Sequence, residues 1–202
     1  SDDAVHLDIR FTGSVDAIRA LNEGRCTLAG FHTLEQPDAD SLAARTYRPL
    51  LQPGLHKLIG FARRTQGLIV APGNPLGLHS LDDVARSGAR FVNRPLGSGT
   101  RVLLDDLLAR AGLVPEDITG YAQHEPSHGA VAQAVAAGSA DVGVGIELAA
   151  RMRDNGMAAL ALPGILRAGE GKNLPVRGLP PLPAELCGNM TAIVLLPERD
   201  HG

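Results

Sequence analysis

A short β-like run that leads through a glycine- and hydroxyl-rich turn into a long amphipathic helix constrains the fold of this chain most. The run begins at Phe91, the turn contains Ser98 and Thr100, and the helix continues to Ala111. The first turn of a helix has unpaired N–H groups and a partial positive charge, so it favours an anion. Ser98 or Thr100 also suits an ordinary structural N-cap. The segment therefore predicts a strand–turn–helix unit whose helix start is either simply capped or an anion site.

Two arginines flank this helix start. Arg101 lies in the first turn, where the helix dipole disfavours a cation by about 0.3–1 kcal/mol. A bound anion would remove that penalty, so we favour a ligand contact for Arg101 over a solvated surface position. For Arg94 both a solvated loop position and a ligand contact stay open.

Composition narrows the class of protein. With 202 residues, 44% hydrophobic and 20% charged, the chain has room for one large globular domain or two smaller lobes. The net charge of -3 gives no attraction to nucleic acid, and 3% aromatic residues disfavour a stacking platform for bases. Cys26 and Cys187 are too few and too far apart for a metal framework, so we expect small buried hydrophobes rather than a disulfide, and no metal or cofactor.

Targeting signals are not visible in the sequence. It contains no run of about 18 apolar residues, and no signal peptide precedes the first strand-like segment. We expect no membrane contact, and we interpret the sequence as a module of a longer protein. A mature exported protein would have the same appearance.

A helix–glycine–strand pattern occurs twice. Residues 5–11 alternate like a strand, a helix follows to Gly24, and residues 26–31 form the next strand. Later, residues 118–121 are a predicted strand, a helix stops at Gly138, and residues 140–146 are strand-like. The repetition predicts two similar α/β lobes, with helix starts and strand ends at the same edge of each sheet.

The remaining segments complete this outline. Two β-rich runs between residues 55 and 71 connect the lobes, and Ser80 caps a short helix with Asp83 in a capping box. We expect a helix over 147–155, a strand over 158–162, an irregular loop over 163–183 and a last strand over 190–196.

Four segments carry a family resemblance: residues 66–75, 91–101, 120–131 and 138–146. Together they resemble the periplasmic-binding-protein-like domain of the molybdate-binding type. That domain is often fused behind a winged helix-turn-helix in transcription regulators or behind a molybdopterin-biosynthesis domain. The chain is also similar, more distantly, to effector domains of LysR-type regulators.

The resemblance implies a type II periplasmic-binding-protein-like α/β fold, with a ligand in a cleft between two lobes. Lobe one would comprise residues 1–75 together with a returning strand at about 188–197, and lobe two residues 76–160. Residues 163–183 depart from the family pattern and look like an insertion.

Carried onto this sequence, the resemblance implies a set of ligand contacts at helix starts and strand ends. They are Thr12, Gly13, Ser14 and His32 in lobe one, and Asn93, Arg94, Ser98, Gly99, Thr100, Arg101, Ser127 and His128 in lobe two.

Structural alternatives stand beside several of these contacts. Ser14 could be a simple helix cap, and His32 an interior histidine that is fully hydrogen-bonded. His128 could form a structural hydrogen bond with Glu125. A catalytic couple of His128 and Glu125 has less support because no serine or cysteine nucleophile with a supporting elbow is nearby. Nucleotide hydrolysis also has little support, because the sequence contains no Walker motif.

These observations predict a non-enzymatic, cytoplasmic sensor domain that binds molybdate or tungstate and signals to a fused upstream domain. A homodimer stays open, and we expect no direct contact with nucleic acid. Two rival interpretations are a LysR-type effector domain for a small organic acid and an exported solute-binding protein of a transporter. An enzyme or a molybdopterin-biosynthesis accessory is a third class.

Overall fold

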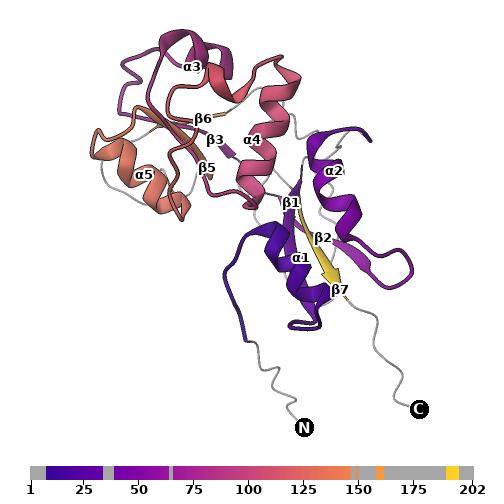
Figure 1. Cartoon of the computed structure of the whole chain (residues 1–202). Coiled ribbons are helices and arrows are strands. Elements are labelled where there is room, and N and C mark those ends of the chain that lie inside the picture. The colour runs from indigo at the N-terminus through magenta and orange to yellow at the C-terminus, as the bar shows by residue number, and fades with distance from the viewer. Residues whose placement is uncertain are drawn as a thin grey trace, which may run out of the picture.

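Two β-sheets, each with its own helices, make up the computed structural model (Figure 1). The structure describes residues 8–33, 39–63, 66–146, 149, 158–161 and 190–195. The first sheet with its helices is called the first half below, and the second sheet with its helices the second half.

The first sheet has the strand order β1–β7–β2. Its strands are β1 (Leu28–Thr33), β2 (Lys57–Arg63) and β7 (Met190–Leu195), and β7 runs antiparallel to both neighbours. The last of the described strands therefore lies at the centre of the first sheet.

Helices α1 (Ser14–Asn22) and α2 (Leu42–Tyr47) belong to this half, and the 3-10 helix Arg48–Leu50 follows α2. In α1, Ile18 and Leu21 recur at helical spacing and are almost fully buried. They form an apolar cluster with α2, β1 and one residue of the second half. Its members are Val15, Ile18, Leu21, Ala29, Phe31, Ala43, Tyr47 and Val102.

The second sheet has the strand order β4–β5–β3–β6. These strands are β4 (Phe91–Val92), β5 (Val142–Ile146), β3 (Gln66–Val70) and β6 (Ala158–Ala161). β4 is parallel to β5, whereas β3 is antiparallel to both β5 and β6. The helices of this half are α3 (Leu81–Ser87), α4 (Gly99–Arg110) and α5 (His128–Ala136), with a 3-10 helix at Pro115–Asp117.

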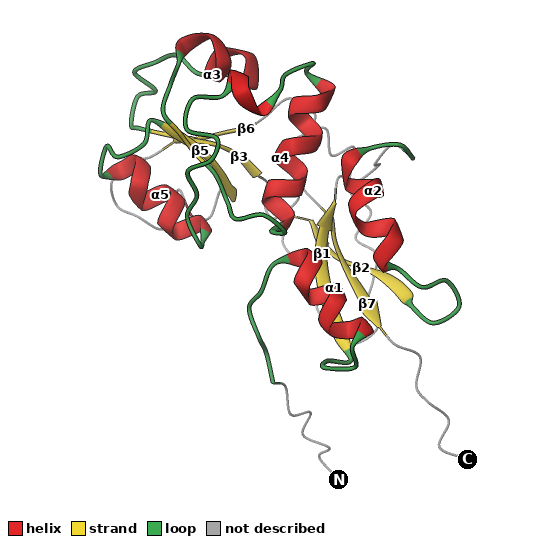
Figure 2. Cartoon of the chain, in the orientation of Figure 1, coloured by secondary structure: helices red, strands yellow, loops and turns green. Residues whose placement is uncertain are grey.

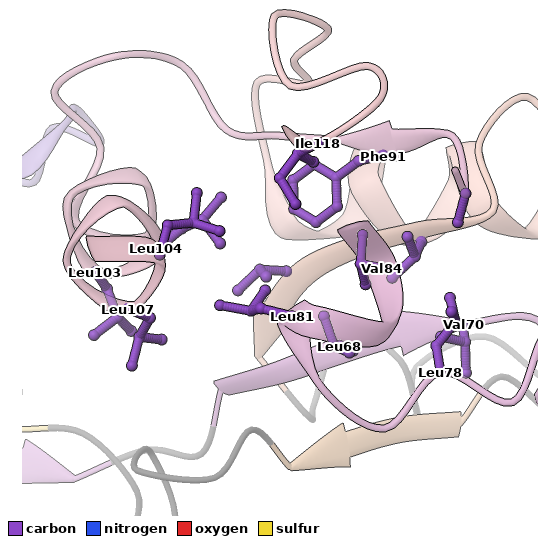
Figure 3. Close-up of a cluster of buried hydrophobic side chains, with 14 residues drawn as sticks. Leu68, Val70, Leu78, Leu81, Val84, Phe91, Leu103, Leu104, Leu107 and Ile118 are labelled. Carbon is purple, nitrogen blue, oxygen red and sulfur yellow. The ribbon is translucent and has the colours of Figure 1, made fainter. Parts of the chain in front are cut away.

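Helices cover both faces of the second sheet, which explains why every residue of β3 is buried. Leu68 and Val70 pack with α3 and α4 in the cluster drawn in Figure 3, while Ile69 packs with Val131 and Val135 of α5. Alternate residues of β3 thus pack into two separate hydrophobic clusters, one on each face of the sheet.

Helix α4 connects the two halves. Val102 belongs to the apolar cluster of the first half, whereas Leu104 and Leu108 belong to that of the second. The Leu42 N–H at the start of α2 donates to Asp106 Oδ1 of α4 over 2.9 Å. Because α4 packs into both cores, its N-terminal turn has a fixed place at the junction.

Most predicted elements are confirmed. Helices start near residues 14, 81, 99 and 128, strands occur at 28–33, 57–63, 66–70, 142–146 and 158–161, and the stop of α5 at Gly138 has the expected left-handed backbone. Ser80 Oγ accepts the Asp83 N–H over 3.1 Å, so the predicted cap of α3 is correct. The predicted helix at 147–155 lies largely outside the described residues, and the 163–183 loop lies wholly outside them.

Two predicted strands are wrong where the structure describes them. Residues 8–11 form no strand, and the Phe11 side chain is 96% exposed, so the apolar alternation there finds no sheet face. Residues 118–121 are turns, because the Thr119 carbonyl accepts the Phe91 N–H over 2.8 Å from a chain that bends at Gly120. The turn thus provides a hydrogen-bond acceptor for the backbone at the edge of β4, although it is not a regular strand.

The division between sheets falls earlier than residue 75. β3 at Gln66–Val70 already belongs to the second sheet, so the chain crosses between β2 and β3. The other predicted lobe boundaries stay predictions. Cys26 is half-buried against the first core, and Cys187 lies outside the described residues.

Within the part of the chain that the structure describes, no helix is long and apolar enough to cross a membrane.

Candidate ligand-binding site

The N-terminal ends of α1 and α4 meet between the two halves (Figure 2). The Val15 N–H of α1 donates to the Gly97 carbonyl over 3.1 Å. A Cβ on Gly13 would lie 2.9 Å from the same carbonyl oxygen, so only glycine allows this approach. Gly97 itself has a φ of +82°, a left-handed conformation that suits glycine. The positive ends of the α1 and α4 dipoles, which belong to different halves of the molecule, therefore lie close together.

Ser14 and His32 converge on Gly99 at this junction. A Cβ on Gly99 would lie 2.6 Å from Ser14 Oγ and 2.7 Å from His32 Cδ2. The helix start and the strand end of the first half therefore share one edge, as the sequence predicts, and that edge faces the start of α4.

Ser14 has a different local role from the one expected. Gly13 is the N-cap of α1, no side chain caps this helix, and Ser14 is its first residue. The prediction that Ser14 caps the helix is wrong because the close approach of Gly97 requires glycine at the cap position. The Ser14 hydroxyl, only 5% exposed, is thus not engaged in capping.

Ser98 is the N-cap of α4. Its Oγ accepts the Arg101 N–H over 3.2 Å, which is the structural alternative raised for this residue. The hydroxyl proton of a capping serine can still be donated elsewhere. Thr100, 3% exposed, is buried in the same turn, and Thr12 is exposed just before α1.

Arg94 is a half-buried cation at the end of β4. Its Nη2 donates to the Pro126 carbonyl over 2.9 Å, while its buried Nε makes no hydrogen bond. Burial lowers the pKa of the guanidinium from its usual value. Among the described residues no carboxylate pairs with Arg94, so its charge is not compensated there.

Arg101 has a compensated charge. Its Nε donates to Asp105 Oδ1 over 3.0 Å, and its guanidinium carbon lies 4.1 Å from the centre of the Tyr121 ring. Tyr121 in turn donates its hydroxyl to Asp105, and burial followed by this carboxylate raises the pKa of Tyr121. Arg101 Nη1 also lies 3.4 Å from the Arg94 carbonyl. A ligand contact by Arg101 stays a prediction, but Asp105 already supplies the negative charge that we assigned to an anion.

Asn93 organises the same loop. Its Nδ2 donates to the Tyr121 carbonyl over 3.2 Å, and its Oδ1 accepts the Arg94 N–H over 2.8 Å. The side chain is 2% exposed. Asn93 therefore fixes the direction in which the backbone of Arg94 leaves β4.

The start of α5 joins this arrangement through Arg94, whose guanidinium bonds to Pro126. Ser127 is exposed and caps α5, with Oγ accepting the Ala130 N–H over 3.0 Å. His128 follows as the first helical residue, and its Nδ1 would lie 3.4 Å from a Cβ on Gly145. The expected contacts of Ser127 and His128 with a ligand stay predictions.

Two buried polar side chains near these elements were missed by the sequence analysis. Tyr47 at the end of α2 is 3% exposed, and its hydroxyl has no hydrogen bond. Gln66 at the start of β3 is fully buried, and neither of its amide atoms is bonded. The scarcity of tyrosine, two in the chain, is a signal that could have drawn attention to Tyr47. No comparable signal marks Gln66.

In the described ranges no cluster of three or more His, Cys, Asp or Glu side chains could hold a metal ion.

Two α/β units joined by a chain crossing, with helix starts that meet between them, define the type II periplasmic-binding-protein-like fold. Residues 1–156 match the family described as "PBP superfamily domain", and the chain belongs to this family. Domains of this family bind ligands and are not enzymes, so this domain is a binding module.

One curated protein is similar to this chain in sequence. A protein of Bacillus subtilis (strain 168), "Uncharacterized protein YvgK", is 34% identical over 143 residues, which are 71% of this chain and 46% of the relative. The chain thus spans about half the length of that curated relative.

Two solved structures have the same fold at low identity. One is the effector binding domain of QuiR in complex with shikimate, with 14% identity and a TM-score of 0.58 over 93% of this chain and 70% of that one. The other is a putative phosphate ABC transporter substrate-binding protein of Clostridium perfringens with bound phosphate. It is 15% identical, with a TM-score of 0.54 over 92% of this chain and 72% of that one.

Proposed function

We propose that this domain binds a small oxyanion, with molybdate and tungstate as the first candidates, beside the junction of α1 and α4. The observation that carries the proposal is the meeting of two helix N-termini, together with Arg94 in the segment that leads into α4, a half-buried cation without a carboxylate partner in the described chain. Unpaired N–H groups, hydroxyls and one net positive charge match a compact anion.

The number of hydrogen bonds that micromolar binding needs can be compared with the donors at this junction. A neutral hydrogen bond contributes about 0.5–1.5 kcal/mol and one to a charged group about 1.5–3 kcal/mol. A micromolar affinity corresponds to about 8 kcal/mol, so about five such bonds are needed. Groups from both helix starts and from Arg94 would therefore have to act together, which ties occupancy to the arrangement of the two halves.

A sensor role follows from this coupling. We propose that a DNA-binding or molybdopterin-biosynthesis domain, carried upstream in the full-length protein, responds to the change, and that the protein acts in the cytoplasm. A homodimer and the set of ligand contacts named from the sequence belong to the same proposal.

A small organic acid is the second candidate ligand. One structural neighbour holds shikimate, a carboxylate, and another holds phosphate. An arginine side chain recognises both groups through paired N–H donors. The choice between them depends on which anion the site prefers.

The test is a thermal-shift and calorimetric titration of the chain with molybdate, tungstate, phosphate, sulfate and shikimate. A ligand present at 100 times its Kd adds about 2.7 kcal/mol, which raises the Tm of a chain of this size by about 5–10 °C. Arg94→Gln should abolish the shift. Arg86→Gln, which removes an exposed arginine paired with Asp83 on α3, is the matched control and should keep it.

The outcomes separate the candidates. A shift with molybdate or tungstate supports the oxyanion proposal, whereas a shift with shikimate alone supports an organic acid. No shift with any of these anions, or an equal shift in Arg94→Gln, would contradict the assigned site.

A further inference from the structure

The Tyr47 ring packs close to the junction of α1 and α4, against residues that are adjacent in sequence to proposed ligand contacts. Its centroid is 4.7 Å from that of Phe31, which precedes His32 in β1. Tyr47 also shares an apolar cluster with Val15, the residue after Ser14, and with Val102 of α4. The ring is therefore held by both halves at once.

The buried hydroxyl of Tyr47 destabilises the fold in this conformation. It is buried and makes no hydrogen bond. A buried polar group without a partner loses its hydrogen bonds to water without replacement, and phenylalanine would pack equally well without that cost. Packing alone therefore does not explain a tyrosine at this position.

Ser14 is the polar group beside the Tyr47 hydroxyl. Burial raises the pKa of Tyr47 to about 12, and the Ser14 side chain opposes that rise. The Tyr47 hydroxyl is therefore protonated at neutral pH and can act as a donor, although its geometry toward Ser14 falls short of a hydrogen bond in this conformation.

We propose that Tyr47 is a positioning residue for the ligand-binding hydroxyl of Ser14, an inference that rests on the proposed function. When an anion binds, the Tyr47 O–H donates to Ser14 Oγ, and the single Ser14 proton points to the anion. A serine hydroxyl has one donor and two acceptor sites, so a donor on one side selects the direction of its proton. Without Tyr47 the Ser14 proton has no fixed direction.

The surroundings of Ser14 favour this arrangement. Its Oγ faces Gly99, where a Cβ would lie only 2.6 Å away, so no side chain of α4 separates it from the α4 start. No side chain caps α1, so the Ser14 hydroxyl is not used by the N–H groups of its own helix start. The pair thus provides one aimed neutral donor beside two helix starts.

The experiment measures tungstate affinity for the wild-type chain, Tyr47→Phe, Ser14→Ala and the double variant, together with the urea midpoint of each without ligand. Tyr47→Phe should weaken binding about three- to tenfold, the effect of one lost orienting hydrogen bond. The double variant should bind as Ser14→Ala does, because Tyr47 has nothing left to orient. The urea midpoint of Tyr47→Phe should stay equal or rise, since an unpaired hydroxyl is removed.

Thr46→Val is the matched control on the same helix. It removes a hydroxyl that donates to the Leu42 carbonyl over 2.8 Å, and it should leave tungstate affinity unchanged. A second readout is near-UV difference absorption on saturation with tungstate. The chain has two tyrosines and no tryptophan, so the part of the signal lost in Tyr47→Phe reports a new hydrogen bond at Tyr47.

Each result has one meaning. If the wild type binds tungstate and Tyr47→Phe binds it equally well, the positioning role is overturned and the proposed function stands. If Tyr47→Phe loses affinity only in proportion to lost stability, or adds fully to Ser14→Ala, the role is also overturned. If the wild type binds neither tungstate nor molybdate, the oxyanion function fails, and this inference fails with it.

Discussion

Arg94 and Arg101 show how two like charges at one strand–turn–helix unit can have different roles. Arg101 is 8% exposed and has Asp105 and the Tyr121 ring as partners, whereas Arg94 has a single carbonyl partner for its side chain. A compensated cation holds a structure together, and an uncompensated one attracts an anion. The chemical environment, rather than the residue type, assigns the role.

A substitution of Arg101 should therefore affect stability more than binding. Arg101→Gln leaves the largely buried Asp105 carboxylate with the Tyr121 hydroxyl but without its cationic partner, and the free energy of unfolding should fall by about 2–3 kcal/mol. Urea denaturation measures the loss, and titration with tungstate should show a smaller change in Kd than Arg94→Gln. Full stability with abolished binding would instead make Arg101 a ligand contact.

Of the two partners of Arg101, one could be predicted from the sequence and the other could not. Asp105 follows Arg101 by four residues, the spacing of an ion pair on a helix, so that partner could have been predicted. Tyr121 could not, because it comes from a turn after the 3-10 helix and reaches α4 only through tertiary packing. Tyr47 was missed for the same reason.

At the scale of elements, helix starts carry most of the information in this chain. α3, α4 and α5 each begin at a serine whose Oγ accepts the N–H of the third helical residue, and these starts were predictable from local chemistry. α1 begins at Gly13 instead, because another backbone occupies the place of a capping side chain. The turns at 118–121 were not predictable, since their hydrogen bonds to β4 involve residues far apart in the sequence.

The start of α3 should respond to acid. A hydrogen bond from Arg86, then bonds from the His79 N–H and Ser80, lower the pKa of Asp83 from 3.8 to about 2. The lowered pKa means that ionised Asp83 stabilises the fold above about pH 4, and that this contribution is lost as the pH falls through 2. Urea midpoints measured between pH 5 and 2 should fall less steeply for Asp83→Asn than for the wild type. Parallel slopes would contradict this role.

At the scale of the whole molecule, the two halves are held at the position where their helix starts touch. Gly99 lies in this contact, with Ser14 and His32 of the first half against it. The two sheets were predictable from the repeated helix–glycine–strand pattern. The contact was not, because it depends on how α4 packs into both cores at once.

A methyl group at Gly99 should force the halves apart. In Gly99→Ala the new Cβ would lie 2.6 Å from Ser14 Oγ and 2.9 Å from His32 Cβ, so one half must shift. We expect a loss of about 1–3 kcal/mol in stability, typical of an overpacked contact, and at least tenfold weaker tungstate binding. Gly30→Ala in β1, where a Cβ meets nothing within 4 Å, is the control for the added methyl group. Unchanged binding in Gly99→Ala would show that the junction is not part of the site.

The central position of β7 has a consequence for biosynthesis. β1 and β2 are not neighbours in the first sheet, and each pairs with β7. During translation β1 and β2 leave the ribosome before β7, so they lack their shared hydrogen-bonding partner until residues 190–195 emerge. The helices and strands from β3 to β5, which form the second core, are by then already synthesised. The vectorial order of synthesis therefore lets the later-encoded sheet mature first, and β1 and β2 wait until β7 has emerged from the ribosome.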